Sequence, residues 1–409
     1  MKRVFIISPF CLGAVVSRGA DAKGVATKNA DGQGQATALI TNIGARQRES
    51  LDGVWRSVID LSEKGLYSTS LTSKKDPHYL DARYTDPGKL QEYDFGTDKT
   101  ILVPGDWNMQ RPEWYYYEGD MWYRRLFQAK KEGSKRRFIY FGAVNYRCNI
   151  YLNGKPLGSH EGGFTPFNVE VTNHLVDGEN SLILLVNNRR DKSNIPTIVM
   201  DWWNYGGITR PSWLVSTPKT FIRDYCIQLA RGDAARISGW GQLDGDDLGQ
   251  QVTLRIPELG IDRKATCDAT GRAVFDIAIK KATLWEPENP KLYDVLLASK
   301  DDSVADRIGL RTIETRGNEV LLNGRKIFLR GICIHEEAPF SSGRAWAPEQ
   351  DAILLGWAKE LGCNFIRLAH YPHNEDMIRL AEQMGLMVWS EIPVYWPSTG
   401  RTRPPMPTP

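Results

Sequence analysis

Polar side chains stand at the ends of three short apolar segments near the end of the chain. His335 follows the first segment, Arg367 and His370 lie at the end of the second, and Glu391 follows the third. These side chains form directional, often charge-assisted hydrogen bonds. The hydroxyl groups and carboxylates of a sugar are suitable partners for them. The residue types therefore predict a binding site for a sugar.

Structural roles compete with this interpretation. A single histidine after a strand commonly serves the fold by hydrogen bonding, so the binding role depends on three polar ends in succession. Glu391 could be a catalytic carboxylate, or it could brace the guanidinium group of Arg367. We favour the bracing role.

The elements around these residues alternate between strand and helix. A helix is expected over 349–361, and a second one begins at an Asn374 cap and stops at Gly385. The expected strands are 326–329, 364–368 and 386–389. Such repetition is typical of the opening of a parallel (β/α)8 barrel, whose active site lies at the C-terminal ends of the strands. Because closure requires eight strands, residues 314–396 are expected to form only the N-terminal part of a TIM barrel domain.

The preceding sequence predicts two β-sandwiches. Between residues 47 and 217, alternating strands such as 137–141 and 181–186 are separated by Asn-Gly and Asp-Gly turns. Residues 218–313 contain further strands and have the length of one immunoglobulin-like sandwich. The fold class is therefore multidomain, with two β-sandwiches followed by α/β structure.

The N-terminus has the features of a secretory signal peptide. Lys2 and Arg3 precede an apolar run over 4–16, and Ala20-Asp21-Ala22 is typical of a cleavage site after residue 22. We expect a periplasmic or secreted protein with a flexible spacer over 23–46, which is rich in Gly and Ala. No apolar run is long enough to span a bilayer.

The composition excludes several classes of protein. The chain is 41% hydrophobic and 25% charged, with a formal net charge of +3, so neither nucleic acid nor an anionic membrane is expected as a partner. Thirteen tryptophans could stack on sugars, although most are expected in the sandwich cores. The cysteines are scattered and lack a C-x-x-C pair, which predicts neither a disulfide framework nor a metal site.

Two segments of the expected barrel match a known signature. Residues 364–372 (NFIRLAHYP) and 385–389 (GLMVW) resemble the first signature of glycoside hydrolase family 2, which includes β-glucuronidases, β-galactosidases and β-mannosidases. The sequence departs from the pattern at Leu368, where a small residue is usual, and at Glu382, where Asp or Asn is usual. The resemblance implies that the C-terminal domain is a TIM barrel of this family.

The resemblance extends over nearly all of the chain after the signal. Residues 103–107 and 117–124 resemble the N-terminal sugar-binding jelly roll of the family. The loop 201–208 (DWWNYGGI) resembles the loop that this domain sends into the active site, and the resemblance assigns Asp201 to contact with substrate hydroxyls. A carboxylate that only caps the loop is the alternative for Asp201. These segments look most similar to bacterial β-glucuronidases, with β-galactosidases next.

The family's catalytic residues have no counterpart that we can assign. The resemblance implies a retaining mechanism with two glutamates about 5 Å apart. It places both on later barrel strands, the acid/base in an Asn-Glu pair. The pairs Asn318-Glu319 and Asn374-Glu375 are not expected at such a strand end. We therefore assign no catalytic residue and expect the chain to be inactive alone.

Residues 397–409 fit neither a strand nor a barrel helix, because the run is rich in proline. Deletion of one base after the codon of Trp396 can produce this tail from a sequence that resembles the family's continuation. We interpret the tail as the product of a frameshift.

The leading hypothesis is a truncated family 2 exo-β-glycosidase with a β-glucuronide substrate, and a β-galactoside is the alternative within the family. A non-catalytic carbohydrate-binding protein made of the two sandwiches is the alternative from another class. No cofactor is expected in this chain, although galactosidases of the family use Mg²⁺ through ligands partly beyond residue 409. The full-length parent could form a homo-oligomer, because family members often assemble through the sandwich domains.

Overall fold

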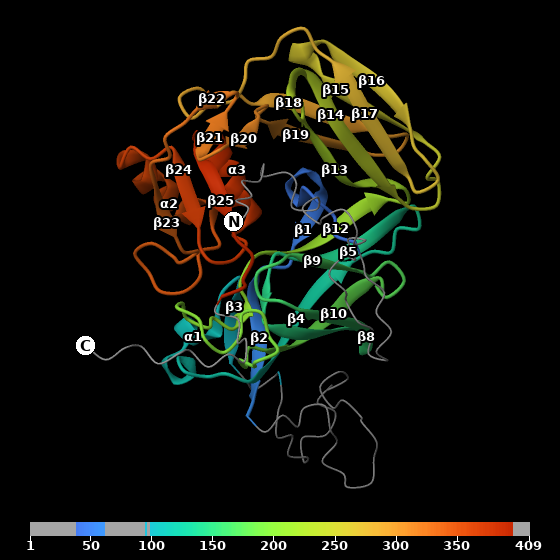
Figure 1. Cartoon of the computed structure of the whole chain (residues 1–409). Helices are drawn as coiled ribbons and strands as arrows, with labels where there is room; N and C mark the ends of the chain where they lie inside the picture. The colour runs from blue at the N-terminus through green and yellow to red at the C-terminus, as the bar shows by residue number, and fades with distance from the viewer. Residues whose placement is uncertain (1–37, 62–94, 96–98, 396–409) are drawn as a thin grey trace, which may run out of the picture.

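The computed structural model describes residues 38–61, 95 and 99–395. Figure 1 shows two β-sandwiches and, beside them, a smaller unit of strands and helices. The expected signal peptide, residues 23–37 of the expected spacer and the tail 397–409 lie outside the described residues. Within the described residues, no helix is both long enough and apolar enough to cross a membrane.

The first unit is a sandwich of two antiparallel sheets, with the strand orders β3-β2-β4-β10-β7-β8 and β1-β12-β5-β9. A short ribbon of β6 and β11 and the helix α1 belong to the same unit. The expected sugar-binding sandwich is confirmed. The elements are β1 (Gln47–Ser50), β2 (Gly53–Asp60), β3 (Thr100–Val103), α1 (Trp107–Gln110), β4 (Asp120–Ala129), β5 (Lys135–Phe141), β6 (Val144–Asn145), β7 (Arg147–Leu152), β8 (Lys155–Glu161), β9 (Phe167–Glu170), β10 (Gly178–Asn187), β11 (Gly207–Ile208) and β12 (Ser212–Pro218).

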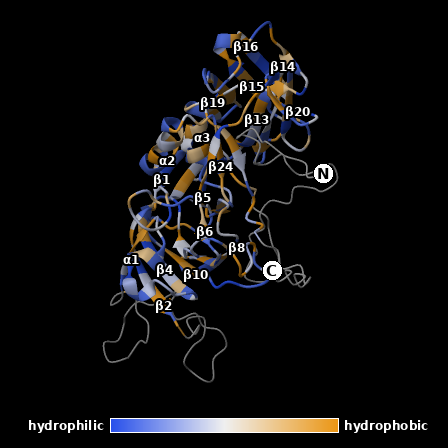
Figure 2. Cartoon of the chain, turned by 60° about the vertical axis from the view of Figure 1, so that its left-hand side comes forward, coloured by the Kyte–Doolittle hydropathy of each residue, from blue (hydrophilic) through white to orange (hydrophobic). Residues whose placement is uncertain are grey.

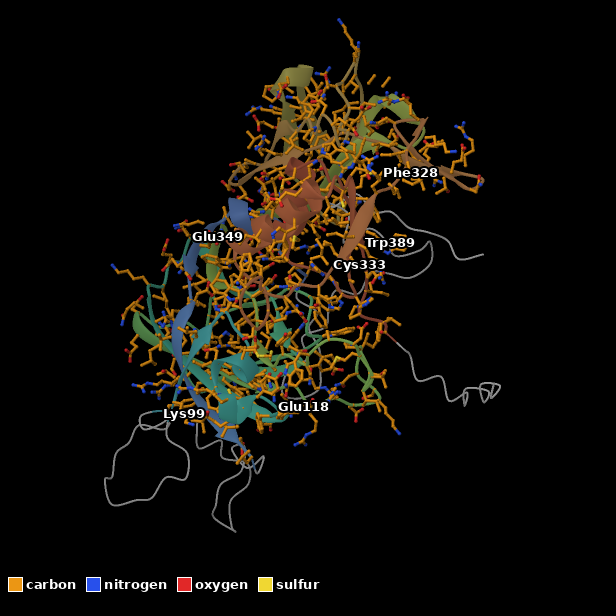
Figure 3. The ribbon with its side chains drawn as sticks, turned by 90° about the vertical axis from the view of Figure 1, so that its left-hand side faces the viewer. Lys99, Glu118, Phe328, Cys333, Glu349 and Trp389 are labelled. Atoms are coloured by element: carbon orange, nitrogen blue, oxygen red, sulfur yellow. The ribbon has the colours of Figure 1, made fainter. Side chains whose placement is uncertain are left out.

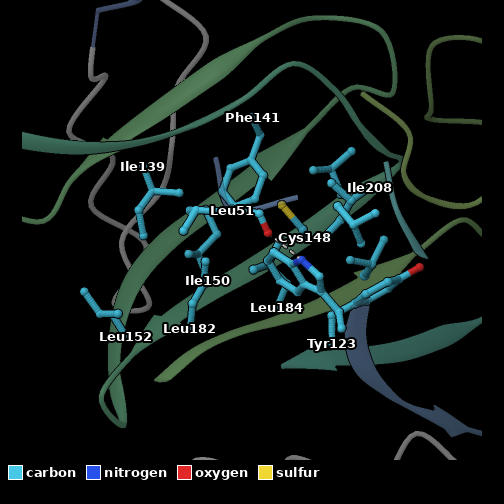
Figure 4. Packing of buried hydrophobic residues seen from close by; sticks show 14 of the residues in the cluster. Leu51, Tyr123, Ile139, Phe141, Cys148, Ile150, Leu152, Leu182, Leu184 and Ile208 are labelled. Atoms are coloured by element: carbon cyan, nitrogen blue, oxygen red, sulfur yellow. Dashed lines mark hydrogen bonds between the residues drawn. The ribbon is translucent and has the colours of Figure 1, made fainter. Parts of the chain in front are cut away.

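Alternating apolar residues of these strands fill the space between the two sheets. Figure 4 shows Phe141, Ile150 and Leu184 among the clustered side chains, and all three are fully buried. Full burial of such a side chain stabilises the fold by about 1.5–3 kcal/mol. The β7–β8 hairpin turns at Asn153 and Gly154, which both have positive φ angles, as a tight two-residue turn requires.

Residues 38–46 differ from the flexible spacer expected there. The buried Ile40 donates its amide hydrogen to Asn168 Oδ1 of the first sandwich at 2.9 Å. The buried Arg46 forms a 2.7 Å ion pair with Asp302 of the second sandwich. The segment therefore contacts both sandwiches, because its apolar and charged side chains find buried partners where the Gly/Ala-rich composition ends.

The second unit is an immunoglobulin-like sandwich of a three-stranded and a four-stranded sheet, ordered β13-β14-β17 and β16-β15-β18-β19. Buried and exposed residues alternate strictly along β19, which is the pattern of a strand with one face on the core. Figure 2 shows hydrophilic and hydrophobic residues mixed along the strands of this sandwich. Its strands are β13 (Phe221–Ala230), β14 (Asp233–Asp244), β15 (Gln251–Ile256), β16 (Ile261–Thr266), β17 (Arg272–Ala278), β18 (Tyr293–Ala298) and β19 (Ser303–Ile308).

The third unit begins with a small antiparallel sheet of β20 (Ile313–Arg316), β21 (Glu319–Leu322) and β22 (Arg325–Lys326). A parallel sheet follows, and the expected opening of a TIM barrel is confirmed. Its elements are β23 (Gly331–Ile334), α2 (Pro348–Glu360), β24 (Phe365–Leu368), α3 (Glu375–Gln383) and β25 (Met387–Ser390).

The strand expected over 326–329 is wrong. Asn323 and Gly324 turn the chain with positive φ angles, and residues 325–326 then pair antiparallel with β21. The first parallel strand starts only at Gly331. The tight turn thus uses the beginning of the expected strand to close a hairpin.

The parallel sheet has one covered and one more open face. Ile334, Ile366 and Leu368 are buried and belong to the same core cluster as residues of α2 and α3. The alternate residues, which include Cys333 and Trp389, lie on the opposite face. Figure 3 shows these two along one side of the unit.

Helix α3 is docked on the second sandwich. The indole nitrogen of the buried Trp285 donates to the carbonyl oxygen of Glu382 at 2.9 Å, and the Glu382 carboxylate pairs with Arg311 at 2.5 Å. A second ion pair joins Arg379 to Asp306 at 2.7 Å. Glu382, a departure from the family signature, therefore has a structural partner in the neighbouring domain.

Candidate sugar-binding site

The parallel sheet brings the three polar strand ends to one edge. The last residues of β23, β24 and β25 lie beside one another in the ladder. His335 and Glu391 directly follow β23 and β25, and His370 lies two residues after β24. Their side chains therefore start from the C-terminal edge, where barrels of this kind build their sites.

Asp201 reaches this edge from the first sandwich, on the loop 188–206 between β10 and β11. Reciprocal hydrogen bonds close the neck of the loop. Asn188 Nδ2 donates to the carbonyl oxygen of Asn204 at 3.1 Å, and Asn204 Nδ2 donates to that of Asn188 at 2.6 Å. Asp201 Oδ2 lies 3.5 Å from His370 Nε2. The loop thus carries a carboxylate from one domain to a histidine of another.

Glu391 holds Arg367 of β24 and His370, which follows that strand. Arg367 donates through Nε to Glu391 Oε1 at 2.8 Å and through Nη2 to Oε2 at 3.1 Å. The same Oε2 lies 3.1 Å from His370 Nδ1. A bidentate salt bridge of this kind fixes the plane of the guanidinium group. This geometry agrees with the bracing role favoured for Glu391.

His335 lies against His370, with ring centroids 5.1 Å apart and the rings nearly perpendicular. Burial lowers the pKa of His335, and the nearby Glu337 opposes this effect. The imidazole is therefore neutral at neutral pH, with one N–H donor and one acceptor nitrogen. That combination suits a sugar hydroxyl, which both donates and accepts a hydrogen bond.

Trp202 is a site residue that the sequence reasoning did not single out. Its ring lies 5.9 Å from His370, 5.2 Å from Tyr371 and 5.3 Å from Tyr395, measured between centroids. It also borders a pocket that Phe164 helps to line. The position next to Asp201 in the DWWNYGGI loop is the signal that could have identified it.

A buried charged cluster behind the site was also missed. Glu336, which is 0% exposed, accepts a 2.8 Å hydrogen bond from Arg210 of the first sandwich and a second bond from Arg344. It also accepts the amide hydrogen of Asn374 at 2.6 Å. Burial alone would raise the pKa of Glu336, but Arg210 and Arg344 hold this pKa below its usual value. Arg210 lies 126 residues before Glu336, so no local pattern predicts their pairing.

Asp201, His335 and His370 form a group of possible metal ligands that was not expected from the sequence. One donor atom of each residue lies within 4.8 Å of the other two. The free cysteines do not extend this group, and Cys333, the exposed one among them, lies 3.6 Å from Arg367 Nη1.

The five residues predicted from the sequence are thus connected side by side. Asp201 and His335 lie against His370, and Arg367 and Glu391 hold the other side of that ring. Together they offer two carboxylates, two imidazole rings and one guanidinium group, and the ring of Trp202 lies beside them. Such a set can hold and orient a sugar by directional hydrogen bonds and ring stacking.

Three family models match successive parts of the chain. Residues 49–218 match the sugar-binding domain of "Glycosyl hydrolases family 2", residues 230–311 match the model named after the family itself, and residues 313–399 match its TIM barrel domain. The matched ranges follow the three units of the structure.

Curated relatives include a putative β-glucuronidase of Formosa agariphila, 30% identical over 72% of this chain and 36% of the relative. A β-glucuronidase of Streptococcus agalactiae is 29% identical over 73% of this chain and 53% of its own length. A β-galactosidase of Thermoanaerobacter pseudethanolicus is 29% identical, with coverages of 74% and 44%. The chain therefore spans about half the length of these relatives or less.

Solved structures with the same arrangement include a Bifidobacterium dentium β-glucuronidase complexed with coumarin-3-O-glucuronide. It has a TM-score of 0.71 and 27% identity, and the match covers 86% of this chain and 62% of that one. A β-glucuronidase from an uncultured Clostridium has a TM-score of 0.71 and 26% identity, with coverages of 87% and 60%.

Proposed function

The chain belongs to glycosyl hydrolases family 2, and from this premise we propose that it forms the sugar-holding part of a retaining exo-β-glycosidase whose substrate is a β-glucuronide. The observation that carries the proposal is the meeting of Asp201, from the first sandwich, with His335 and His370, from the barrel. β-Glucuronidases among the relatives and the solved structures support the choice of sugar.

Each residue has a role that follows from its contacts. Asp201 accepts hydrogen bonds from sugar hydroxyls, and His335 and His370 bind hydroxyls through their ring nitrogens. Arg367 and Glu391 are positioning residues that fix the His370 ring. Trp202 offers an aromatic surface beside them.

We also propose that the described residues bind the sugar without cleaving it. Neither Asn-Glu pair of the described chain supplies a glutamate at the site. Glu375 forms an ion pair with Arg379 within α3, and Glu319 pairs with Lys326 in the small antiparallel sheet. Glu391 is already held by Arg367 and His370. Retaining hydrolysis requires one carboxyl group as acid/base and another as nucleophile.

A β-galactoside is the second candidate, and the charges of the site favour it. Asp201, Glu337 and Glu391 bring three carboxylates, whereas the guanidinium group of Arg367 is paired with Glu391. These residues suit hydroxyl groups better than the carboxylate of a glucuronide. The β-galactosidase among the relatives points in the same direction.

Isothermal titration calorimetry with phenyl β-D-glucuronide and phenyl β-D-galactoside tests the proposal on the 409-residue chain. We expect the glucuronide to bind, and Asp201→Ala to weaken it at least tenfold, which corresponds to about 1.4 kcal/mol. Asp262→Ala, on the surface of the second sandwich, is the matched control.

Binding that survives Asp201→Ala, or binding of the galactoside alone, contradicts the proposal for the glucuronide. Release of nitrophenol from 4-nitrophenyl glycosides contradicts binding without cleavage.

The signal-like N-terminus leads us to propose export to the periplasm or the medium. Fractionation of producing cells, followed by N-terminal sequencing, tests this proposal. A mature N-terminus at Lys23 in the exported fraction supports it, and an intact Met1 in the cytoplasm contradicts it.

A further inference from the structure

Two imidazoles and a carboxylate converge at the edge of the barrel sheet. The donor atoms of Asp201, His335 and His370 lie within 4.8 Å of one another, and the distance from Asp201 Oδ2 to His370 Nε2 is 3.5 Å. In a tetrahedral zinc site with metal–nitrogen bonds of about 2.0–2.1 Å, neighbouring donors are about 3.4 Å apart. The Asp201–His370 pair therefore already has the spacing of two metal ligands, and the third donor must approach by at most about 1.4 Å.

The surroundings resemble those of a metal-binding histidine. Glu391 Oε2 and Arg367 Nη2 contact His370 Nδ1 at 3.1 and 3.0 Å, which leaves Nε2 directed toward Asp201. A carboxylate on the far nitrogen of a histidine ligand orients the ring and strengthens metal binding. Within the described part of the chain, the buried Nδ1 atom of His335 has no hydrogen-bond partner. One imidazole is thus oriented, and the other has a nitrogen available for a new bond.

The local charge favours a cation. Asp201, Glu337 and Glu391 contribute three negative charges around the two imidazoles, and Arg367 contributes one positive charge. The nearby Arg344 shares the carboxylate of Glu336 with Arg210, so this cluster adds one positive charge and the site remains net negative. A net negative site raises the local concentration of cations.

We propose that Asp201, His335 and His370 bind one divalent transition-metal ion of the Zn²⁺ class, and that the bound ion excludes the sugar. Two imidazoles with one carboxylate suit zinc, cobalt or nickel, whereas magnesium and calcium prefer oxygen ligands. Water completes the coordination. Metal binding rests on the geometry of the three residues, and the exclusion of the sugar rests also on the proposed function.

Titration of the untagged, EDTA-treated and dialysed 409-residue protein tests the site. Calorimetry with ZnCl₂ is expected to show one equivalent bound, and CoCl₂ is expected to give a visible absorption band. His335→Gln and Asp201→Asn should each weaken zinc binding at least tenfold, and Glu391→Gln should weaken it by about 10-fold to 100-fold. His174→Gln, in the connection between β9 and β10 of the first sandwich, should leave zinc binding unchanged. Cys333→Ser should also leave it unchanged, which separates the site from the exposed thiol. Circular dichroism of each variant checks that it folds.

The outcomes separate the two proposals. Equal zinc affinity in the wild type, Asp201→Asn and a folded His335→Gln overturns the metal site. The absence of binding at 1 mM ZnCl₂ overturns it too, because the binding free energy would then be weaker than about 4 kcal/mol. If zinc binds and no glycoside binds to the metal-free protein, the metal site stands and the proposed function fails. If a glycoside binds equally well with zinc present at saturation, the exclusion is overturned. If it binds at least tenfold more weakly, the exclusion is supported.

Discussion

Arg210 and Glu336 join the first sandwich to the barrel through a 2.8 Å hydrogen bond between positions 126 residues apart in the chain. Glu336 directly follows the site residue His335, and Arg210 Nη2 also donates to the carbonyl oxygen of Pro372, two residues after His370. One arginine of the sandwich is therefore connected to both barrel segments that carry site histidines. The position of these histidines relative to Asp201 depends on this junction.

Glu336→Gln should destabilise the protein by roughly 3–5 kcal/mol, because it leaves the buried guanidinium groups of Arg210 and Arg344 without their carboxylate. Equilibrium unfolding in urea measures the effect. Glu319→Gln removes an exposed partner of Lys326 and should cost about 0–1 kcal/mol. Equal unfolding midpoints for the two variants would show that the buried cluster is unimportant for stability.

Arg367→Lys should weaken glycoside binding at least tenfold while changing stability by less than about 1 kcal/mol, because lysine cannot form the two-pronged contact with Glu391. Calorimetry and thermal unfolding, measured on the same samples, distinguish the two effects. Arg255→Lys changes an exposed pair on the second sandwich and should bind as the wild type does. Unchanged affinity in Arg367→Lys argues against the positioning role.

Trp202→Ala should reduce glycoside affinity by about 10-fold or more, since the ring lies against His370 and Tyr371. Trp240→Ala is the control, because that indole stacks on Arg272 in the second sandwich. Quenching of tryptophan fluorescence by bound glycoside should also be smaller in Trp202→Ala than in Trp240→Ala. Equal quenching in both variants would place the sugar elsewhere.

Asp351→Asn should make the protein more stable than the wild type above about pH 8 and equally stable near pH 4. Burial raises the pKa of Asp351 to about 8, with Glu336 and Asp376 contributing. The folded state keeps the proton between about pH 4 and 8, whereas the unfolded chain has lost it, so this carboxyl group lowers stability as the pH rises through that window. Urea unfolding at pH 5, 7 and 8.5 checks the sign. A difference that grows toward low pH would disprove it.

The sequence was most informative where local chemistry decides the structure. The Asn374 cap and the Gly385 stop delimit α3 closely, because both act on the backbone next to them. The strand expected over 326–329 failed because a turn diverted its first residues into a hairpin.

In the candidate site, too, local signals could be read from the sequence and long-range contacts could not. His335, Arg367, His370 and Glu391 could be placed together from parallel strand order alone. Arg210 could not, since its neighbours Thr209 and Pro211 give no indication of a partner in another domain. The ordered residues 38–46 were missed for a similar reason, because their partners lie more than a hundred residues away.

The closed neck of the loop 188–206 separates the site residues Asp201 and Trp202 from the strands β10 and β11 that support the loop. Asn188 and Asn204 bond to each other's backbone, so residues 189–203 can vary in length and chemistry while the strands on either side keep their register. Evolution could therefore exchange this loop as a cassette, altering which sugars are recognised without rebuilding either the sandwich or the barrel. For protein engineers, the same neck offers a graft point for new specificity.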